Sequence, residues 1–303
     1  MPAKFFSPDN DLQSTLAGIL EKTWETFPEL AQNQVAVTWI VYEPPYRINT
    51  GGGLSAEEFW QYQPSGASYR GVELIEPASL VTLFYLVAAH VWLEQGMVQP
   101  SPDLEQALGD MITKDSSEAT SYVVDVLSGT TSGPPIPPGP LATWESQRNI
   151  VNRYFQQLGW PELRAVNMNQ KIWRDRPYGR EQAFLGPARE NRNLLTTEAT
   201  ARLLHSIVGG VSVSATRSQR MMDLLRQTVS VGIPQTAPVW FKGGGNERVN
   251  HSAAYVEAEG VHPYQLVIFT EGRLQDQKEV VVPFISGEIF KASQQAFQVA
   301  QAH

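Results

Sequence analysis

Residues 77–96 read P-A-S-L-V-T-L-F-Y-L-V-A-A-H-V-W-L-E-Q-G. Ser79 precedes an unbroken apolar run from Leu83 to Ala89, and apolar side chains occupy nearly every face of a helix drawn through this stretch. The pattern predicts a buried helix capped by Ser79, because a serine hydroxyl accepts a hydrogen bond from an unpaired N–H of the first turn. The short length and His90 argue against a membrane span. A serine at this position is either a plain cap or a nucleophile.

Strand patterns lie toward both ends of the chain. Residues 35–42 are apolar on both faces, which is typical of the interior of a sheet. Three later runs also have the composition of strands: 239–241, 253–257 and 265–270. We therefore expect one sheet that is assembled from the two ends of the chain.

Helical spacing of apolar residues dominates the middle of the chain and both of its flanks. Ser7 and Pro8 are typical of a helix start, with Ser7 as the cap. The stretches with helical spacing are 8–27, 55–62, 103–113, 117–127, 144–158, 196–207, 218–227 and 286–301. Residues 128–140 are rich in proline and predict a loop, and residues 165–192 predict a long ordered loop of the kind that often carries function.

These elements predict an α+β protein with two lobes. Residues 1–70 and 211–303 form the α/β lobe, and residues 71–210 form a mostly helical lobe that carries the serine helix and the long loop. Clefts between lobes are common ligand sites. We expect a small-molecule or peptide ligand there.

Composition narrows the classes of function. Of the 303 residues, 42% are hydrophobic and 18% are charged, as in a folded globular protein. The net charge of -8 argues against nucleic acid as a partner, because phosphate binding needs clustered Lys and Arg. Cysteine is absent and the five histidines lack metal-ligand spacing, so we expect no metal and no cofactor.

The beginning of the chain bears on its location. Residues 1–13 turn polar too soon for a signal peptide. As written, the sequence predicts a cytoplasmic protein with no membrane partner, or a periplasmic one if a leader was removed.

Two stretches point to one family: Pro77-Ala78-Ser79 before the buried helix, and residues 239–245, which read V-W-F-K-G-G-G. They resemble the P-A-S-x-x-K motif and the K-T-G strand of the penicillin-recognising serine hydrolases, which include the class A β-lactamases. Residues 111–120 lie where S-D-N-x-A-T is expected, and residues 193–204 look like the segment after the active-site loop. The resemblance spans most of the chain. It implies a β-lactamase-like fold, an antiparallel sheet flanked by helices with an all-helical lobe inserted.

The resemblance also implies roles for residues. Ser79 is the nucleophile, and its N–H and that of Gly245 form the oxyanion hole. Lys242 supplies the cation that holds a substrate carboxylate, beside Gly243 and Gly244. The alternative for Lys242 is an exposed lysine on an edge strand.

Several groups used by the family's chemistry are replaced. The lysine of S-x-x-K falls at Thr82, and the hydroxyl of K-T-G is lost at Gly243. The deacylating glutamate falls at Arg176, with Asp175 adjacent but one residue out of place. Efficient hydrolysis of penicillins is not expected, because loss of a positioned general base costs about 10²–10⁴ in rate.

The S-D-N segment aligns in two ways. In one alignment, Asp115-Ser116-Ser117 puts Ser117 in place of asparagine; in the other, Lys114 replaces the proton-relaying serine. Lys114 is either a replacement amine or a solvated lysine at a helix start. We expect Ser79, Lys242 and either Ser116 or Ser117 to line one cleft.

Two classes of function follow from these residues. One is a weak or altered serine hydrolase that acts on a β-lactam, a D-alanyl peptide or another amide or ester. The other is a non-catalytic binding protein on the same scaffold. A serine that is acylated without a deacylating base would act as a trap.

Overall fold

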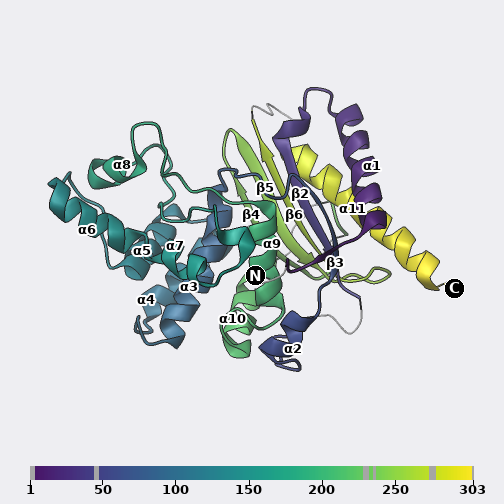
Figure 1. The fold of residues 1–303 in the computed structure, drawn as a ribbon, viewed down its shortest axis with the longest axis horizontal. Helices are drawn as coiled ribbons and strands as arrows, with labels where there is room; N and C mark the ends of the chain where they lie inside the picture. The colour runs from purple at the N-terminus through teal and green to yellow at the C-terminus, as the bar shows by residue number, and fades with distance from the viewer. Residues whose placement is uncertain (1–3, 44–47, 228–231, 235–236, 273–277, 302–303) are drawn as a thin grey trace.

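In the computed structural model, which describes residues 4–43, 48–227, 232–234, 237–272 and 278–301, six strands form one sheet in the order β1-β3-β2-β6-β5-β4 (Figure 1). The strands are β1 (Ser7–Pro8), β2 (Val35–Val41), β3 (Ser65–Tyr69), β4 (Val239–Gly245), β5 (Val249–Val256) and β6 (Tyr264–Glu271). β2 and β4 belong to the same sheet, so the assembly from both chain ends is confirmed. The sheet is mixed rather than purely antiparallel, because β1 pairs with β3 in parallel.

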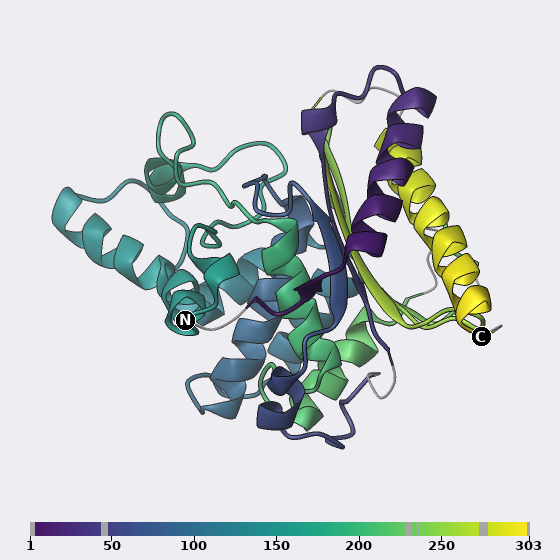
Figure 2. The ribbon, with the colours of Figure 1, turned by 45° about the vertical axis from the view of Figure 1, so that its right-hand side comes forward.

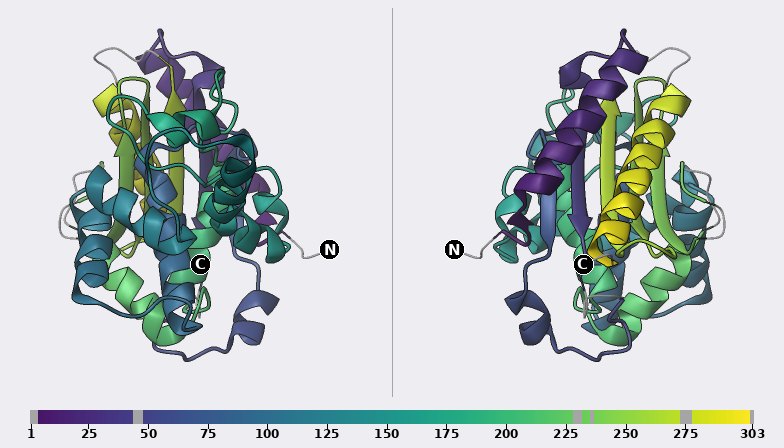
Figure 3. Two further views of the ribbon diagram at one scale, coloured as in Figure 1. Left: turned by 90° about the vertical axis from the view of Figure 1, so that its left-hand side faces the viewer. Right: turned by 90° about the vertical axis from the view of Figure 1, so that its right-hand side faces the viewer.

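Helices cover both faces of the sheet, as Figures 2 and 3 show. α1 and α11 lie on one face, and α9 lies on the other, with the α3–α8 group beyond it. The helices are α1 (Asn10–Thr26), α2 (Ala56–Gln61), α3 (Thr82–Glu94), α4 (Pro102–Thr113), α5 (Ser117–Ser128), α6 (Pro138–Arg148), α7 (Ile150–Gln157), α8 (Gly179–Leu185), α9 (Thr197–Val208), α10 (Ala215–Leu225) and α11 (Lys278–Gln301). Short 3₁₀ turns are η1 (Gln32–Gln34), η2 (Ala78–Val81) and η3 (Pro161–Leu163). The limits of the two lobes, at 70/71 and 210/211, stay a prediction.

The sheet separates two apolar cores. Val35 and Val37 of β2 pack with the α1 and α11 side, whereas Ala36 and Ile40 pack with the helical side that contains Leu83 of α3. Successive side chains of a strand point to opposite faces. Burial on both faces explains why residues 35–42 are almost entirely apolar.

The predicted buried helix is confirmed, but its start differs from the prediction. All of α3 from Thr82 to Leu93 is buried. Ser79 is not its N-cap, because it lies inside η2, a 3₁₀ turn that precedes α3 and has no side-chain cap. The hydroxyl of Ser79 is directed instead to a partner outside the helix.

Three other expectations are corrected. α1 is capped by Asp9, whereas Ser7 and Pro8 form β1 against residues 65–66, so strand pairing overrides the local helix-start pattern. The single helix expected at 144–158 is two helices, α6 and α7, which meet at Asn149. Residues 165–192 contain α8 and are otherwise irregular. Within the described residues, no helix has the length and apolar character that crossing a bilayer requires.

Candidate active site

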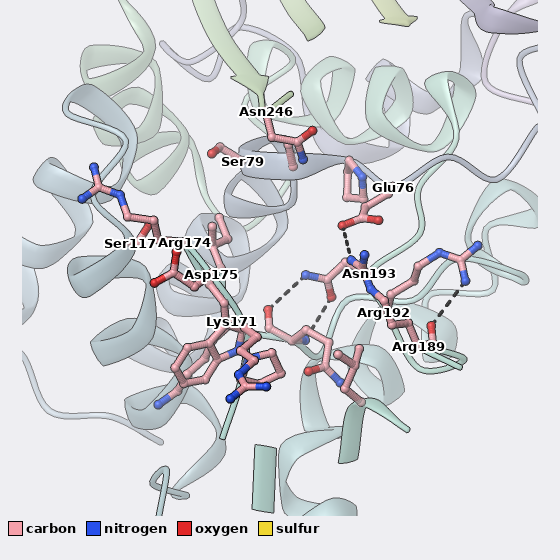
Figure 4. A pocket seen from close by; sticks show the side chains of 18 of the residues that line it. Glu76, Ser79, Ser117, Lys171, Arg174, Asp175, Arg189, Arg192, Asn193 and Asn246 are labelled. Carbon is pink, nitrogen blue, oxygen red and sulfur yellow. Dashed lines mark hydrogen bonds and ion pairs between the residues drawn. The ribbon is translucent and has the colours of Figure 1, made fainter. Parts of the chain in front are cut away.

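A cavity of about 770 Å³ lies at the start of η2. Ser79 lines it from η2, Asp115 from the turn between α4 and α5, Ser117 from the first position of α5, and Gly245 from the end of β4. The loop of residues 165–192 forms the opposite wall (Figure 4). The long loop and the serine predicted from the sequence therefore face the same space.

The carboxylate of Asp115 joins the serine to the lysine of β4. Ser79 Oγ donates a hydrogen bond to Asp115 Oδ2 at 2.9 Å, and Lys242 Nζ donates to Asp115 Oδ1 at 2.6 Å. Lys242 also donates to the carbonyl of Ile112 at 3.4 Å and is 3% exposed. Asp115 has a φ of +55°, in the left-handed region that aspartate tolerates better than most residues. With the backbone in this conformation, the carboxylate of Asp115 points toward Ser79.

Within the S-D-N segment, Asp115 contacts both Ser79 and Lys242. In the alignment Asp115-Ser116-Ser117, Asp115 stands at the position of the proton-relaying serine. Ser117 lines the cavity. Ser116 caps α5 by accepting a hydrogen bond from the N–H of Ala119 at 3.1 Å, and it is not among the residues that line the cavity.

The structure does not bring Lys114 to the serine. Its side chain is 70% exposed, and its Nζ pairs with Asp110 at 2.8 Å within the same helical turn. This position agrees with the interpretation of Lys114 as a solvated surface lysine. It does not agree with the interpretation of Lys114 as a replacement amine for the serine.

Thr82 occupies the helical turn after the serine and is fully buried. Its Oγ1 donates a hydrogen bond to the carbonyl oxygen of Ser79 at 2.7 Å. The hydroxyl is therefore engaged with the backbone, and Thr82 is not among the residues that line the cavity.

The glycine run of β4 passes close to the serine. A Cβ at Gly244 would lie 2.9 Å from the backbone nitrogens of both Ser79 and Leu80, so only glycine fits. The next residue, Gly245, lines the cavity together with Ser79, and their N–H groups stay the predicted oxyanion hole. Gly243 instead lines a second cavity of about 280 Å³, beside Asp115 and toward α11.

Gly244→Ala is expected to destabilise the protein by about 1–3 kcal/mol, because the new methyl group meets backbone atoms that cannot turn aside. Urea unfolding measures this loss. The matched control is Gly109→Ala in α4, where a Cβ meets nothing within 4 Å and alanine favours the helix by about 0.5–1 kcal/mol. Equal stability of Gly244→Ala and wild type would contradict the close approach.

His251, on β5 opposite Gly244, was not singled out from the sequence. Its Nδ1 accepts a hydrogen bond from the N–H of Thr270 at 3.2 Å, so its Nε2 carries the proton and donates to the carbonyl of Glu76 at 2.9 Å. Burial lowers the pKa of His251 to about 4, so the ring is neutral near pH 7. The imidazole thus holds the segment that leads into Pro77 and the serine.

Asn193 fixes the loop wall of the cavity. Its Oδ1 accepts hydrogen bonds from the N–H groups of Asn169 and Gln170, both at 3.0 Å. Its Nδ2 donates to the carbonyl of Gln170 at 3.0 Å, and Tyr85 of α3 donates to the same oxygen at 2.7 Å. Figure 4 shows Asn193 in the centre of this network. The side chain thereby ties the loop to the serine helix.

A buried charge cluster joins the loop of residues 165–192 to α5 and α6. Lys171 Nζ pairs with Asp125 at 2.7 Å and donates to Ser132 at 2.8 Å. Arg148 pairs with Glu181 at 2.7 Å and with Asp125 at 3.2 Å. No sequence signal pointed to this cluster, because its members are isolated charged residues on separate elements.

Asp175 and Arg176 are exposed on the loop and line the cavity. The guanidinium of Arg176 lies 5.4 Å from the ring centre of Tyr178. No hydrogen bond joins Asp175 to Ser79 within the described residues. The loop therefore presents no carboxylate bonded to the serine.

Comparisons with known proteins concern the family and the fold of the chain. A family model described as the Beta-lactamase enzyme family matches residues 101–292, more than half of the chain. The solved structure of the L158E mutant of PBP-A, an acyl-enzyme complex with penicillin-G, has a TM-score of 0.63 and 16% identity over 97% of this chain and 100% of that chain.

Two β-lactamase structures are also similar. The one from Sphaerobacter thermophilus DSM 20745 has a TM-score of 0.62 and 16% identity over 93% of this chain and 98% of its own. The one from Chitinophaga pinensis DSM 2588 has a TM-score of 0.61 and 13% identity over 93% and 99%. A comparison with curated proteins gave no match. At these identities the structural likeness shows the fold alone.

Proposed function

The chain belongs to the beta-lactamase enzyme family and has a β-lactamase fold, and on this premise we propose that it is an acyl-serine hydrolase in which Asp115 is the base for Ser79. The observation that carries the proposal is the hydrogen bond from Ser79 Oγ to Asp115 Oδ2 at 2.9 Å. A nucleophile within hydrogen-bonding reach of a base that is itself held by a third group is the usual arrangement for covalent catalysis. Lys242, at 2.6 Å from the other carboxylate oxygen, is that third group.

Acylation would proceed in two steps. As Ser79 Oγ attacks the carbonyl carbon of an ester or amide, its proton passes to Asp115, and the N–H groups of Ser79 and Gly245 stabilise the oxyanion. The proton then passes from Asp115 to the leaving group as the bond to that group breaks. The products are the acyl ester of Ser79 and the protonated leaving group. Because a carboxylate is a weaker base than an amine, acylation is slower than with the lysine of S-x-x-K.

Deacylation lacks a general base on the loop side of the cavity at the position where the family has one. Arg176 occupies the position of the deacylating glutamate, and a guanidinium cannot accept a proton from water near neutral pH. The acyl ester is therefore long-lived, and turnover of penicillins is weak. The ligand lies in the cavity between the serine helix and the loop, and its class is a β-lactam, a D-alanyl peptide or another amide or ester.

The second candidate is a non-catalytic binding protein on the same scaffold. It is favoured by Thr82, whose hydroxyl is engaged with the Ser79 carbonyl, so that no amine is positioned at the turn after the serine. In this case the cavity would hold a ligand without forming a covalent bond.

Intact-mass measurement after incubation with a fluorophosphonate and with p-nitrophenyl butyrate tests the two candidates. One adduct is expected on the wild type and none on Ser79→Ala. Ser14→Ala, which alters an exposed serine of α1, serves as the matched control and should be labelled like the wild type. Folded wild type that forms no adduct with either reagent would overturn the acyl-serine proposal and favour the binding protein.

A further inference from the structure

The cation expected to hold a substrate carboxylate is already paired. Lys242 Nζ lies 2.6 Å from Asp115, and the lysine side chain is 4% exposed. Lys242 lines neither the larger nor the smaller cavity. Its charge is therefore neutralised inside the protein before any ligand arrives.

The side of the site next to β4 is unfavourable for an anion. The smaller cavity, on the side of Gly243, is lined by the carboxylates of Asp115 and Glu279. His251 also lines it, but its pKa is lowered to about 4 by burial, so it carries no charge near pH 7. No lysine or arginine is among the described residues that line this cavity.

The loop side of the larger cavity has the opposite character. Arg174, Arg176, Arg189 and Arg192 line it, although the whole chain carries a net charge of -8. Arg189 pairs with Glu76 at 2.8 Å, and so is neutralised. The other three have no carboxylate within salt-bridge distance in the described structure.

The three arginines without a carboxylate partner line the loop side of the cavity at separate points. Figure 4 shows Arg174 on one flank and Arg192 on the other, with Ser79 across the cavity from the loop. Arg192 is partly buried, and its guanidinium donates to the carbonyl of Arg189 at 3.3 Å. Asp175 is the remaining carboxylate of this wall and offsets one of the three charges. A concave wall with an excess of one charge raises the local concentration of the opposite charge.

We propose that the site selects acyl compounds whose anionic group lies toward Arg174, Arg176 and Arg192, whereas the β4 side accepts a neutral group. The acyl part of this inference rests on the proposed function. The anion subsite itself does not, because it depends on where the unpaired charges lie. The substrate class is an ester or amide that carries a carboxylate on the end facing the loop.

Two pairs of esters test which end carries the preferred charge. Mono-p-nitrophenyl glutarate is compared with its neutral methyl ester, and 4-carboxyphenyl butyrate is compared with its own methyl ester. The rate constant for labelling Ser79 is measured for each. In the pair whose carboxylate lies on the end that faces the loop, the anion is expected to react about tenfold faster than its neutral partner, because exposed charge pairs each contribute little.

The arginines are tested with matched variants. The triple variant Arg174→Gln, Arg176→Gln, Arg192→Gln should lose the preference for the anion. The control Arg164→Gln, which changes an exposed arginine that does not line the cavity, should keep it. A preference that survives in the triple variant but disappears in Lys242→Gln would overturn the proposal and return the anion subsite to β4.

Binding without chemistry separates this inference from the proposed function. Ser79→Ala should bind glutarate more tightly than neutral glutaramide in isothermal titration calorimetry, and adding the triple change should remove the difference. If no ester labels Ser79 but this difference is present, the anion subsite stands and the proposed chemistry fails. If glutarate binds no better than glutaramide, the anion subsite is wrong whatever the labelling shows.

Discussion

Asp115→Asn is expected to lower the rate constant for acylation of Ser79 by about 10²–10⁴-fold, because an amide cannot take the proton of the serine hydroxyl. The carboxamide still fills the space between Ser79 and Lys242, so the geometry of the site changes little. The time course of adduct formation with p-nitrophenyl butyrate, followed by intact mass, measures the rate constant.

Stability must be separated from chemistry in this test. Asp115→Asn leaves the buried ammonium of Lys242 without a counter-ion, which costs up to about 3–5 kcal/mol when both partners are buried. Here the cost is lower, since the side chain of Asp115 is 50% exposed and solvent screens the charge. The double variant Asp115→Asn, Lys242→Met removes both charges and should recover stability while acylation stays slow.

A matched control makes the same chemical change outside the site. Asp110→Asn breaks the surface pair with Lys114 and should acylate like the wild type. If the stable double variant acylates Ser79 at the wild-type rate, Asp115 is not the base.

Thr82→Lys combined with Arg176→Glu is expected to raise the turnover of p-nitrophenyl butyrate by about 10²-fold or more, because it restores two positioned bases. A lysine at 82 replaces a residue in contact with Ser79, and its ammonium would share the carboxylate of Asp115 with Lys242. A glutamate at 176 is exposed and lines the cavity, so it can deprotonate the attacking water. Steady-state release of p-nitrophenol measures kcat.

The control for the second position is Thr82→Lys with Arg164→Glu, which places a carboxylate outside the cavity and should leave deacylation slow. Because Thr82 is fully buried, thermal unfolding must show that each variant is folded. Arg176→Glu alone tests the exposed position separately and should shorten the lifetime of the acyl ester. If the double variant is folded but its kcat does not rise, the cleft does not hold an acyl group within reach of residue 176. The non-catalytic binding protein would then be the favoured function.

Penicillin G extends the same experiment. A gain on penicillin G as well as on the neutral ester would show that only the bases are missing. A gain restricted to the neutral ester would agree with a β4 side that disfavours a carboxylate.

Most of the architecture could be predicted from local patterns. The two-sided apolar run at 35–42 and the all-round apolar run after Ser79 specify buried elements, because burial on one or both faces leaves a periodic trace in the sequence. β1 left no such trace. Two residues are too short for a period, and Ser7-Pro8 is locally a helix start whose outcome depends on pairing with residues 65–66.

The site could be predicted only in part. The order of motifs pointed to Ser79 and to the glycine run, and Gly244 does lie against the serine. The sequence left open two alignments of the S-D-N segment and the role of Lys114, and it did not identify Asp115 as a site residue. Which of these two residues turns inward depends on the left-handed backbone of Asp115 and on the pairing of Lys114 with Asp110, neither of which a motif encodes.

The sequence by itself determined the buried elements, because periodicity is a property of short stretches, and its resemblance to the penicillin-recognising serine hydrolases pointed to the scaffold, to Ser79 and to the glycine run of β4. The tertiary structure alone decided the electrostatics. Asp115 meets Ser79 across 36 residues and Lys242 across 127 residues, and these contacts neutralise the lysine and leave the free positive charge on the loop. Coulomb energies depend on distances in space, so a list of charged residues does not show which of them are already paired.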